Sequence, residues 1–144
     1  MRKAVLAVAL FASLAGCVSS YGYEVSGSRV TWNEPNARFL PTPGVTGYDL
    51  EGADATTFVV VSEDRFFARD ARRVYYRNYA LEGANAATWK TLGNSYYSTD
   101  GMSVFYMFWR VDGADVATFR VTDEVLGCAE DAKQSYRYYK AGTC

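Results

Sequence analysis

The chain has 144 residues, of which 49% are hydrophobic and 22% are charged, so it contains enough apolar residues for the core of one globular domain. It has no histidine, which excludes Ser-His and Cys-His nucleophile pairs and removes the side chain that most often binds metals. We therefore expect a protein without enzymatic activity, cofactor or bound metal. The formal net charge of −1, with no basic stripe, argues against nucleic acid as a partner.

Residues 1–16 have the pattern of a bacterial lipoprotein signal peptide. Positive Arg2 and Lys3 precede a short apolar stretch, and small residues come directly before Cys17. The apolar stretch is too short for a membrane-spanning helix, which takes ~20 residues. The pattern predicts that Cys17 is lipidated and that residues 17–22 are a tether, whereas an ordinary secretory signal is the alternative.

The expected location follows from this signal. A mature chain that carries two or three acyl chains on Cys17 is stably anchored in a membrane. Val18 and Ser19 follow Cys17, and the lack of Asp at these positions resembles lipoproteins sent to the outer membrane. We expect a lipid-anchored protein of the cell envelope. In a Gram-negative source it would lie in the outer membrane, facing the periplasm or the cell surface.

The folded part is predicted to be a repeat domain over residues 23–144. Residues 23–32 resemble half of a later copy and are interpreted as a partial N-terminal cap. Residues 33–49 contain all three prolines, which predicts a loop without strand ladders. A unit of about 30 residues then occurs three times, as in stacked repeat proteins. The copies span residues 50–80, 81–110 and 111–144.

Each copy predicts two local structures, so the expected fold is mainly β, with three stacked repeats that each contain a β-hairpin and one short helical turn. The helical turns are predicted to begin at N-cap residues Asp54, Asn85 and Asp115. They would direct into the core the anchor rings Phe58, Trp89 and Phe119. The type I turns of the hairpins are predicted to begin at Asp70, Asp100 and Asp131.

Alternation along the predicted strands indicates which residues share a face. Phe67, Val74 and Tyr76 can lie on one face of their hairpin. Because an isolated hairpin is marginal in water, the copies must stack to bury their rings.

Two cysteines remain in the predicted domain if Cys17 is lipidated. Cys128 and Cys144 form an even pair, and an oxidising compartment favours a disulfide between them. Two free thiols are the alternative. Cys128 stands where the earlier copies have Phe67 and Tyr97, so we expect it to point into the structure.

The hairpin segments carry a resemblance to a known family. Asp70 to Tyr76 reads DARRVYY and Asp100 to Tyr106 reads DGMSVFY, and each is followed by a segment of the type LEGAN or VDGAD. From about Leu50 to Tyr139, this pattern is similar to the DKNYY repeat family of bacterial envelope proteins, although only the Asp and the aromatic pair of the name are kept. The resemblance implies a lipoprotein without an assigned activity, and it supplies no catalytic residues.

The acidic residues have a structural and a chemical interpretation. Asp70, Asp100 and Asp131 recur at one position and could in principle bind Ca²⁺, but each copy offers only one acid there, which favours a turn role. The adjacent pairs Glu63-Asp64 and Asp123-Glu124 could suggest paired carboxylate chemistry. A solvated loop is the simpler interpretation of both pairs.

The aromatic residues are too numerous for one sheet face. A row of exposed rings at repeat spacing could bind a glycan or a partner protein, whereas a second packed layer is the alternative. The candidates for ligand stacking are Tyr75, Phe105, Trp109 and Tyr138.

The sequence thus predicts a lipid-anchored envelope lipoprotein that acts as a non-catalytic binding or structural module. Its expected partners are the membrane, through Cys17, and an envelope protein or cell-wall glycan. The alternatives are a carboxylate-based glycan-acting enzyme and an exclusion or immunity lipoprotein that blocks a surface receptor.

Overall fold

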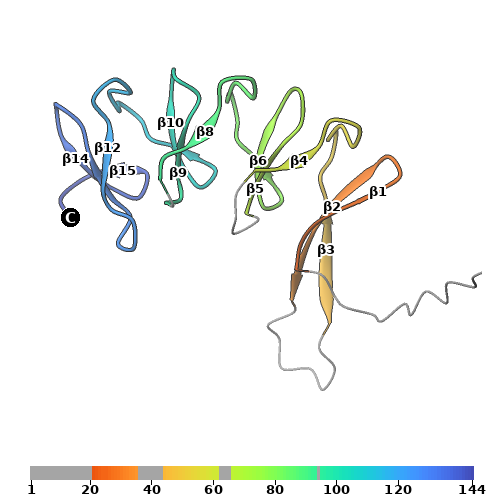
Figure 1. The fold of residues 1–144 in the computed structure, drawn as a ribbon. Coiled ribbons are helices and arrows are strands. Elements are labelled where there is room, and N and C mark those ends of the chain that lie inside the picture. Colours follow the sequence, from red (N-terminus) through yellow and green to blue (C-terminus); the bar gives the residue numbers. More distant parts are fainter. Residues whose placement is uncertain (1–20, 36–43, 62–65, 94) are drawn as a thin grey trace, which may run out of the picture.

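The computed structural model describes residues 21–35, 44–61, 66–93 and 95–144. Within these ranges the chain is mainly β, without helices, and its strands form four small antiparallel sheets. The sheets follow one another in chain order along a curved row (Figure 1). The described residues contain no helix of the length and apolarity that a membrane crossing requires.

The four sheets are local meanders, in which each strand pairs with strands next to it in the chain. The cap sheet contains β1 (Gly22–Ser26), β2 (Arg29–Pro35) and β3 (Val45–Asp49). The first repeat sheet contains β4 (Val59–Val60), β5 (Phe67–Arg69), β6 (Val74–Tyr76) and β7 (Tyr79–Ala80). The second repeat sheet contains β8 (Lys90–Thr91), β9 (Tyr97–Thr99), β10 (Val104–Tyr106) and β11 (Trp109–Arg110). The third repeat sheet contains β12 (Arg120–Asp123), β13 (Cys128–Glu130), β14 (Ser135–Arg137) and β15 (Lys140–Ala141).

The hairpin predicted for each copy is confirmed. In the first repeat sheet β5 pairs with β6, and the equivalent pairs are β9 with β10 and β13 with β14. The Asp70 N–H closes the first turn by donating to the Arg73 carbonyl at 3.0 Å, and the same bond recurs at Asp100 and Asp131. The Asp residues therefore begin the turns, as the sequence predicts.

The predicted helical turn is wrong. The Thr57 N–H donates to the Asp54 carbonyl at 3.2 Å, and the described segment then continues into β4 without a helix. The Asp54 carboxylate accepts the N–H of Thr56 at 3.0 Å, which closes an Asx turn. One hydrogen-bonded turn does not offset the nucleation cost of a helix.

The prediction that residues 33–49 lack strand ladders is wrong at both ends of that range. Asn33 to Pro35 belong to β2 and pair with Val45 to Gly47 of β3. Pro35 is the last residue of β2, where a missing N–H interrupts few ladder bonds. Residues 36–43, which contain the other two prolines, lie outside the described residues.

Ring pairs occupy equivalent places on three successive sheets. The centroid distances are 4.8 Å for Tyr23–Trp32, 5.0 Å for Phe67–Tyr76 and 4.8 Å for Tyr97–Tyr106. The interplanar angles of 65°, 63° and 65° show the same edge-to-face arrangement each time. The anchor rings follow the same spacing, at 5.3 Å for Phe58–Tyr23, 5.2 Å for Trp89–Phe67 and 5.3 Å for Phe119–Tyr97. The prediction that these anchors enter the core is confirmed.

The first and second repeat sheets are packed on both faces. The forward face of the first repeat sheet, toward the next sheet in the chain, carries Phe67, Val74 and Tyr76, which share a core cluster with Phe105 of the second. Its rear face carries Tyr75, which belongs to the core cluster of the cap sheet. The shared face predicted for Phe67, Val74 and Tyr76 is confirmed, and so is the second packed layer.

The third repeat sheet ends the described chain with a covalent link. The sulfur atoms of Cys128 and Cys144 lie at bonding distance and their Cα atoms are 5.9 Å apart, as the disulfide alternative predicts. Cys128 pairs with Arg137 in the register in which Phe67 pairs with Tyr76, and it is buried. The disulfide therefore lies on the forward face, at the place of a core ring.

Candidate binding surface on the edge strands

Exposed side chains lie at one recurring position of the last strand in each sheet. Tyr48 on β3 pairs with Trp32, Tyr79 on β7 pairs with Tyr76, and Trp109 on β11 pairs with Tyr106. Lys140 on β15 is the equivalent residue of the third repeat sheet. Because successive sheets lie in a row (Figure 1), these positions recur along the molecule, one on the outermost strand of each sheet. The exposed fractions are 40% for Tyr48, 49% for Tyr79 and 49% for Trp109.

A second set of rings joins the positions of the three repeat sheets into a continuous row. Phe108 stacks on Tyr79 of the preceding sheet with a centroid distance of 4.3 Å and an angle of 20°. Tyr139 stacks on Trp109 in the same way, at 5.2 Å and 24°. Phe108 and Trp109 are themselves 4.8 Å apart, and the Lys140 ammonium lies 5.2 Å from the Tyr139 centroid. We call Tyr79, Phe108, Trp109 and Tyr139 the aromatic row.

Tight turns between the last two strands position Phe108 and Tyr139. Met107 and Tyr138, the residues before them, have φ of 56° and 58°, a region that non-glycine residues seldom adopt. Their N–H groups donate at 2.8 Å to the carbonyls of Tyr96 and Gly127, which fixes both turns against the preceding hairpin strand. The ring that follows each turn then packs on the neighbouring sheet.

The four rings predicted to stack on a ligand divide into two groups. Tyr75 and Phe105 are buried between sheets, so their proposed ligand role is wrong. The reason is that their strand faces are covered by the preceding sheet. Trp109 and Tyr138 are exposed. Trp109 is part of the aromatic row, whereas Tyr138 packs on Tyr106 at 5.3 Å.

Phe108 and Tyr139 were not among the predicted residues, although the sequence carries a signal for them. They occupy the same place in their copies, because each lies two residues after the end of a hairpin strand, at Tyr106 of β10 and Arg137 of β14. The first copy has Asn78 at that place, so the row does not continue through rings to Tyr48. Comparing equivalent positions beyond the hairpin itself would have identified them.

The recurring Asp residues are occupied by their own chain. In the first copy, one oxygen of Asp70 accepts the N–H groups of Arg72 and Arg73 at 2.7 Å each. The other accepts the Asp54 N–H at 3.0 Å and the Tyr75 hydroxyl at 2.9 Å. Burial alone would raise the pKa of Asp70, but these donors hold it below its usual value. Burial and the Asp70 carboxylate raise the pKa of Tyr75 to about 12.

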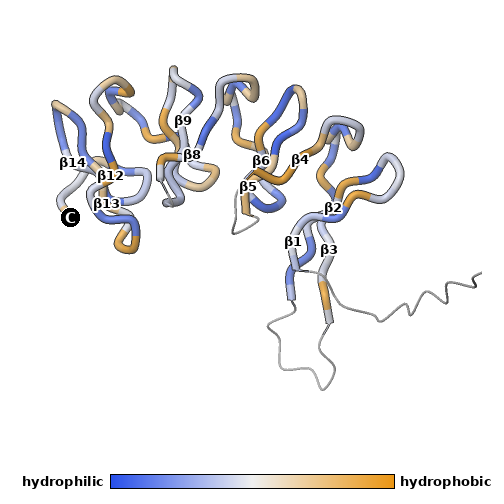
Figure 2. Tube along the Cα trace, in the orientation of Figure 1, coloured by the Kyte–Doolittle hydropathy of each residue, from blue (hydrophilic) through white to orange (hydrophobic). Residues whose placement is uncertain are grey.

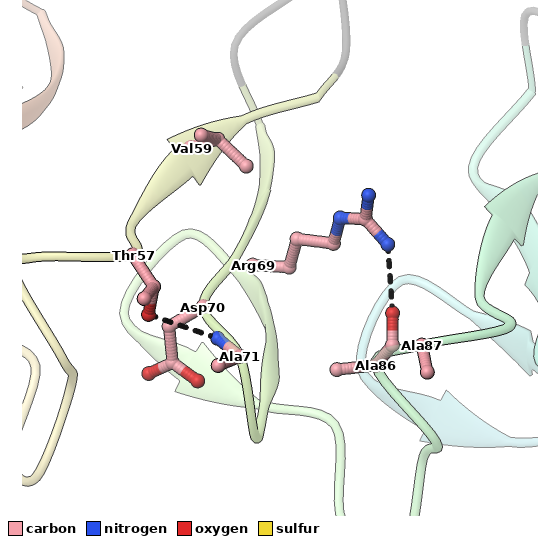
Figure 3. Close-up of a pocket in the computed structure, with 7 residues that line it drawn as sticks. All are labelled: Thr57, Val59, Arg69, Asp70, Ala71, Ala86 and Ala87. Atoms are coloured by element: carbon pink, nitrogen blue, oxygen red, sulfur yellow. Dashed lines mark hydrogen bonds between the residues drawn. The ribbon is translucent and has the colours of Figure 1, made fainter.

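A shallow pocket of about 370 Å³ lies between the first two repeats (Figure 3). Its polar groups bond to the protein itself. Arg69 donates to the Ala86 carbonyl at 2.8 Å and Thr57 accepts the Ala71 N–H at 3.0 Å. The Arg69 bond thus connects two copies, and the polar groups that line the pocket are used within the protein.

The two acidic pairs do not converge on a site in the described part of the chain. Glu63 and Asp64 lie outside the described residues. Asp123 accepts the N–H groups of Val125 and Leu126 at 2.9 and 2.8 Å, so it organises a turn. The described ranges hold no group of three or more Cys, Asp or Glu residues arranged to bind a metal ion.

Comparison with known proteins identifies the family. The model of the DKNYY family matches residues 20–107 and residues 76–141, two overlapping matches that together cover the cap and all three repeat sheets. The chain belongs to the DKNYY family. The overlap is what a repeat family produces, because one model fits more than one register of the copies. No curated protein and no solved structure matches this DKNYY chain.

Proposed function

We propose that this DKNYY protein is a non-catalytic binding module of the cell envelope, held to a membrane by lipidated Cys17, and that its ligand lies along the aromatic row. The observation that carries this proposal is the continuity of the row. Its four rings come from three sheets, yet each ring contacts the next, and the Tyr79 and Trp109 rings are half exposed. Large aromatic rings at a surface are the residues that most often anchor a partner.

The two end faces of the stack also bear on the function. We propose that the three repeats and the partial cap form one stack that does not extend end to end. In the third copy, Cys128, Ser135 and Arg137 replace the forward-face residues Phe67, Val74 and Tyr76. At the other end, the rear face of the cap sheet carries Glu24, Thr31 and Asp49. Polar end faces leave the lateral edge as the surface suited to a ligand.

The acids support a non-catalytic role. The carboxylates of Asp70, Asp100 and Asp131 each accept the N–H groups of their own hairpin turn and of the segment before it. A general acid or base must instead reach a proton of the substrate.

The test is retention of an envelope component by the purified full-length lipoprotein in detergent. The double variant Tyr79→Ala/Trp109→Ala should lose at least tenfold of the component that the wild type retains. Met102→Ala is the matched control, because Met102 is 80% exposed but lies at a hairpin turn outside the row. We expect this control to behave like the wild type.

Two results would contradict the proposal. If the double variant retains as much of the envelope component as the wild type, the aromatic row is not the binding surface. Turnover of cell-wall polymer by the wild type, lost in Asp100→Asn, would favour the glycan-acting enzyme. If the protein retains a single surface receptor and the double variant does not, the binding role is supported and the receptor-blocking lipoprotein is the favoured form of that role.

A further inference from the structure

The way the rings stack decides which part of each ring a partner can contact. Phe108 lies between Tyr79 and Trp109, and Trp109 lies between Phe108 and Tyr139. Lys140 covers Tyr139 at the end of the row. Phe108, Trp109 and Tyr139 each pack against two neighbours and Tyr79 packs against one, so ring faces are largely used within the row and ring edges are the part that all four rings leave for a partner. The faces of Phe108, Trp109 and Tyr139 are therefore less available to a sugar ring that stacks face to face on an aromatic ring.

Ring edges and nearby cations favour the same charge. The edge of an aromatic ring is the positive part of its quadrupole, so it attracts oxygen atoms that carry negative charge. Arg110, next to Trp109 on β11, is exposed, as are Arg137 and Lys140 of the third repeat sheet. The ion pairs among the described residues are Arg29–Asp49, Arg77–Glu34 and Arg120–Glu130. None of them uses these three cations.

Three carboxylates of the third copy lie away from the end of the row at Tyr139. Glu130 pairs with Arg120 on β12, at the opposite edge of the sheet from β15. Glu124 lies against Gly93 of the second copy, beyond β8 and also away from the last strands. Asp123 is used in its turn. At Tyr139, the end of the row, the neighbouring charged group is therefore Lys140, which pairs with Arg137 across β14 and β15.

Apolar side chains adjoin the same end. Val125 is 94% exposed and Leu126 is 54% exposed, at the loop between β12 and β13. This loop is beside the row because the Tyr138 N–H donates to the Gly127 carbonyl at 2.8 Å. A purely ionic polymer would leave these apolar groups unused, whereas a polypeptide can cover them and also supply carboxylates.

We propose that the partner on the aromatic row is an extended acidic segment of a protein, with alternating carboxylates and apolar side chains. This inference rests on the proposed function and adds the chemistry of the ligand. Extension follows from the arrangement of the rings, since the row crosses three sheets that follow one another along the molecule (Figure 1). Trp and Tyr, which the row contains, and Arg, which lies next to it at Arg110, are the residues most enriched at the centres of protein interfaces.

The fluorescence of Trp109 provides the test. Among the three tryptophans, Trp32 and Trp89 are buried, so Trp109 is the one that a ligand on the surface can contact. Full-length protein in detergent is titrated with a synthetic decapeptide of alternating Glu and Leu, with the same peptide carrying Lys in place of Glu, and with an N-acetylglucosamine hexamer. Trp109→Phe keeps the stack and should abolish the signal.

The acidic peptide should bind at least tenfold more tightly than the basic peptide and the hexamer. Its affinity should fall at least fivefold between 50 and 300 mM salt, because the cations are exposed and screened. The double variant Arg137→Gln/Lys140→Gln should lose at least fivefold in affinity. Lys133→Gln is the matched control, since Lys133 is exposed at the hairpin turn of the same sheet and should leave the affinity unchanged.

Equal binding of the basic peptide, tighter binding of the hexamer or no peptide binding would overturn the inference. If the retention experiment still depends on Tyr79 and Trp109, the proposed function stands and only the acidic segment is wrong. If that dependence is also absent, both fail.

Discussion

At the scale of single residues, the recurring Asp does more than begin a turn. Asp100 accepts the N–H groups of Met102 and Ser103 with one oxygen and the Asn85 N–H with the other, at 2.9, 2.7 and 3.0 Å. One carboxylate thus connects a hairpin tip to the segment that enters the same sheet. Burial would raise the pKa of Asp100, but these N–H groups stabilise the charged form and hold the pKa below its ordinary value.

Removing this carboxylate should destabilise the fold. Asp100→Ala leaves three backbone donors without their acceptor, so we expect the free energy of unfolding at pH 7 to fall by about 2–3 kcal/mol, measured by urea denaturation. Asp100→Asn keeps one carbonyl acceptor and should lose less. Equal free energies of unfolding for the wild type and Asp100→Ala would show that the turn forms without the carboxylate.

The effect should depend on pH with a definite sign. The pKa of Asp100 is lower in the folded than in the unfolded protein, so its contribution is present above the unfolded value of about 4. That contribution is lost as the pH falls through the folded pKa. The stability difference between wild type and Asp100→Asn should therefore shrink below pH 4. A difference that stays constant down to pH 2 would contradict this.

At the scale of elements, no hairpin in this molecule is stable by its own contacts. In the first and second repeat sheets, each three-residue strand of the central pair buries side chains on both faces only because a neighbouring sheet covers each face. Edge strands are less well covered. β4 is a continuous hydrophobic stretch in Figure 2, and Val59 and Val60 are exposed there. The equivalent strands β8 and β12 begin with Lys90 and Arg120, charged residues that protect a sheet edge.

The disulfide should stabilise the last sheet, which has lost its forward ring pair. Cys128 and Cys144 are 16 residues apart, and closing a loop of this size contributes about 3 kcal/mol in the chain-entropy model. Cys144→Ser should lower the free energy of unfolding by about this amount, measured by urea denaturation. Reducing agent should bring the wild type to the level of Cys144→Ser and leave the variant unchanged. A wild type that does not respond to reduction would indicate free thiols.

At the scale of the whole molecule, the sheets form a row with one long edge and two polar ends. The line of sheets begins at the cap sheet (Figure 1), whose first strand, β1, starts at Gly22, five residues after Cys17. A lipid on Cys17 would therefore hold the cap sheet within about 18 Å of the membrane surface, given the reach of an extended chain. The aromatic row lies farther along the chain, on the repeat sheets.

Membrane attachment should depend on Cys17. Cys17→Ala should move the protein from the membrane fraction to the soluble fraction, because two or three acyl chains at about 0.8 kcal/mol per buried methylene are then missing. Sedimentation of cell lysates followed by immunodetection measures this. Cys144→Ser is the control, since it removes a different cysteine and should stay with the membrane. A Cys17→Ala variant that still sediments with lipid would rule out the anchor.

The sequence by itself determined the features that depend on neighbouring residues. The hairpins, their Asp turns and the entry of the anchor rings into the core follow from turn chemistry and from alternation within one copy. The pairing of Cys128 with Cys144 was one of two open alternatives. The family match supports the same repeat pattern. These features need contacts over short distances in the chain, which is why local patterns predict them.

Only the tertiary structure decided which rings are exposed. Alternation places Tyr75 and Phe105 on the face opposite Tyr76 and Tyr106, but it does not tell whether another sheet covers that face. Stacking buries them, and it leaves Trp109 at the edge between Phe108 of its own copy and Tyr139 of the next. A surface assembled from three sheets depends on how the sheets pack, and no segment of the chain contains that information alone.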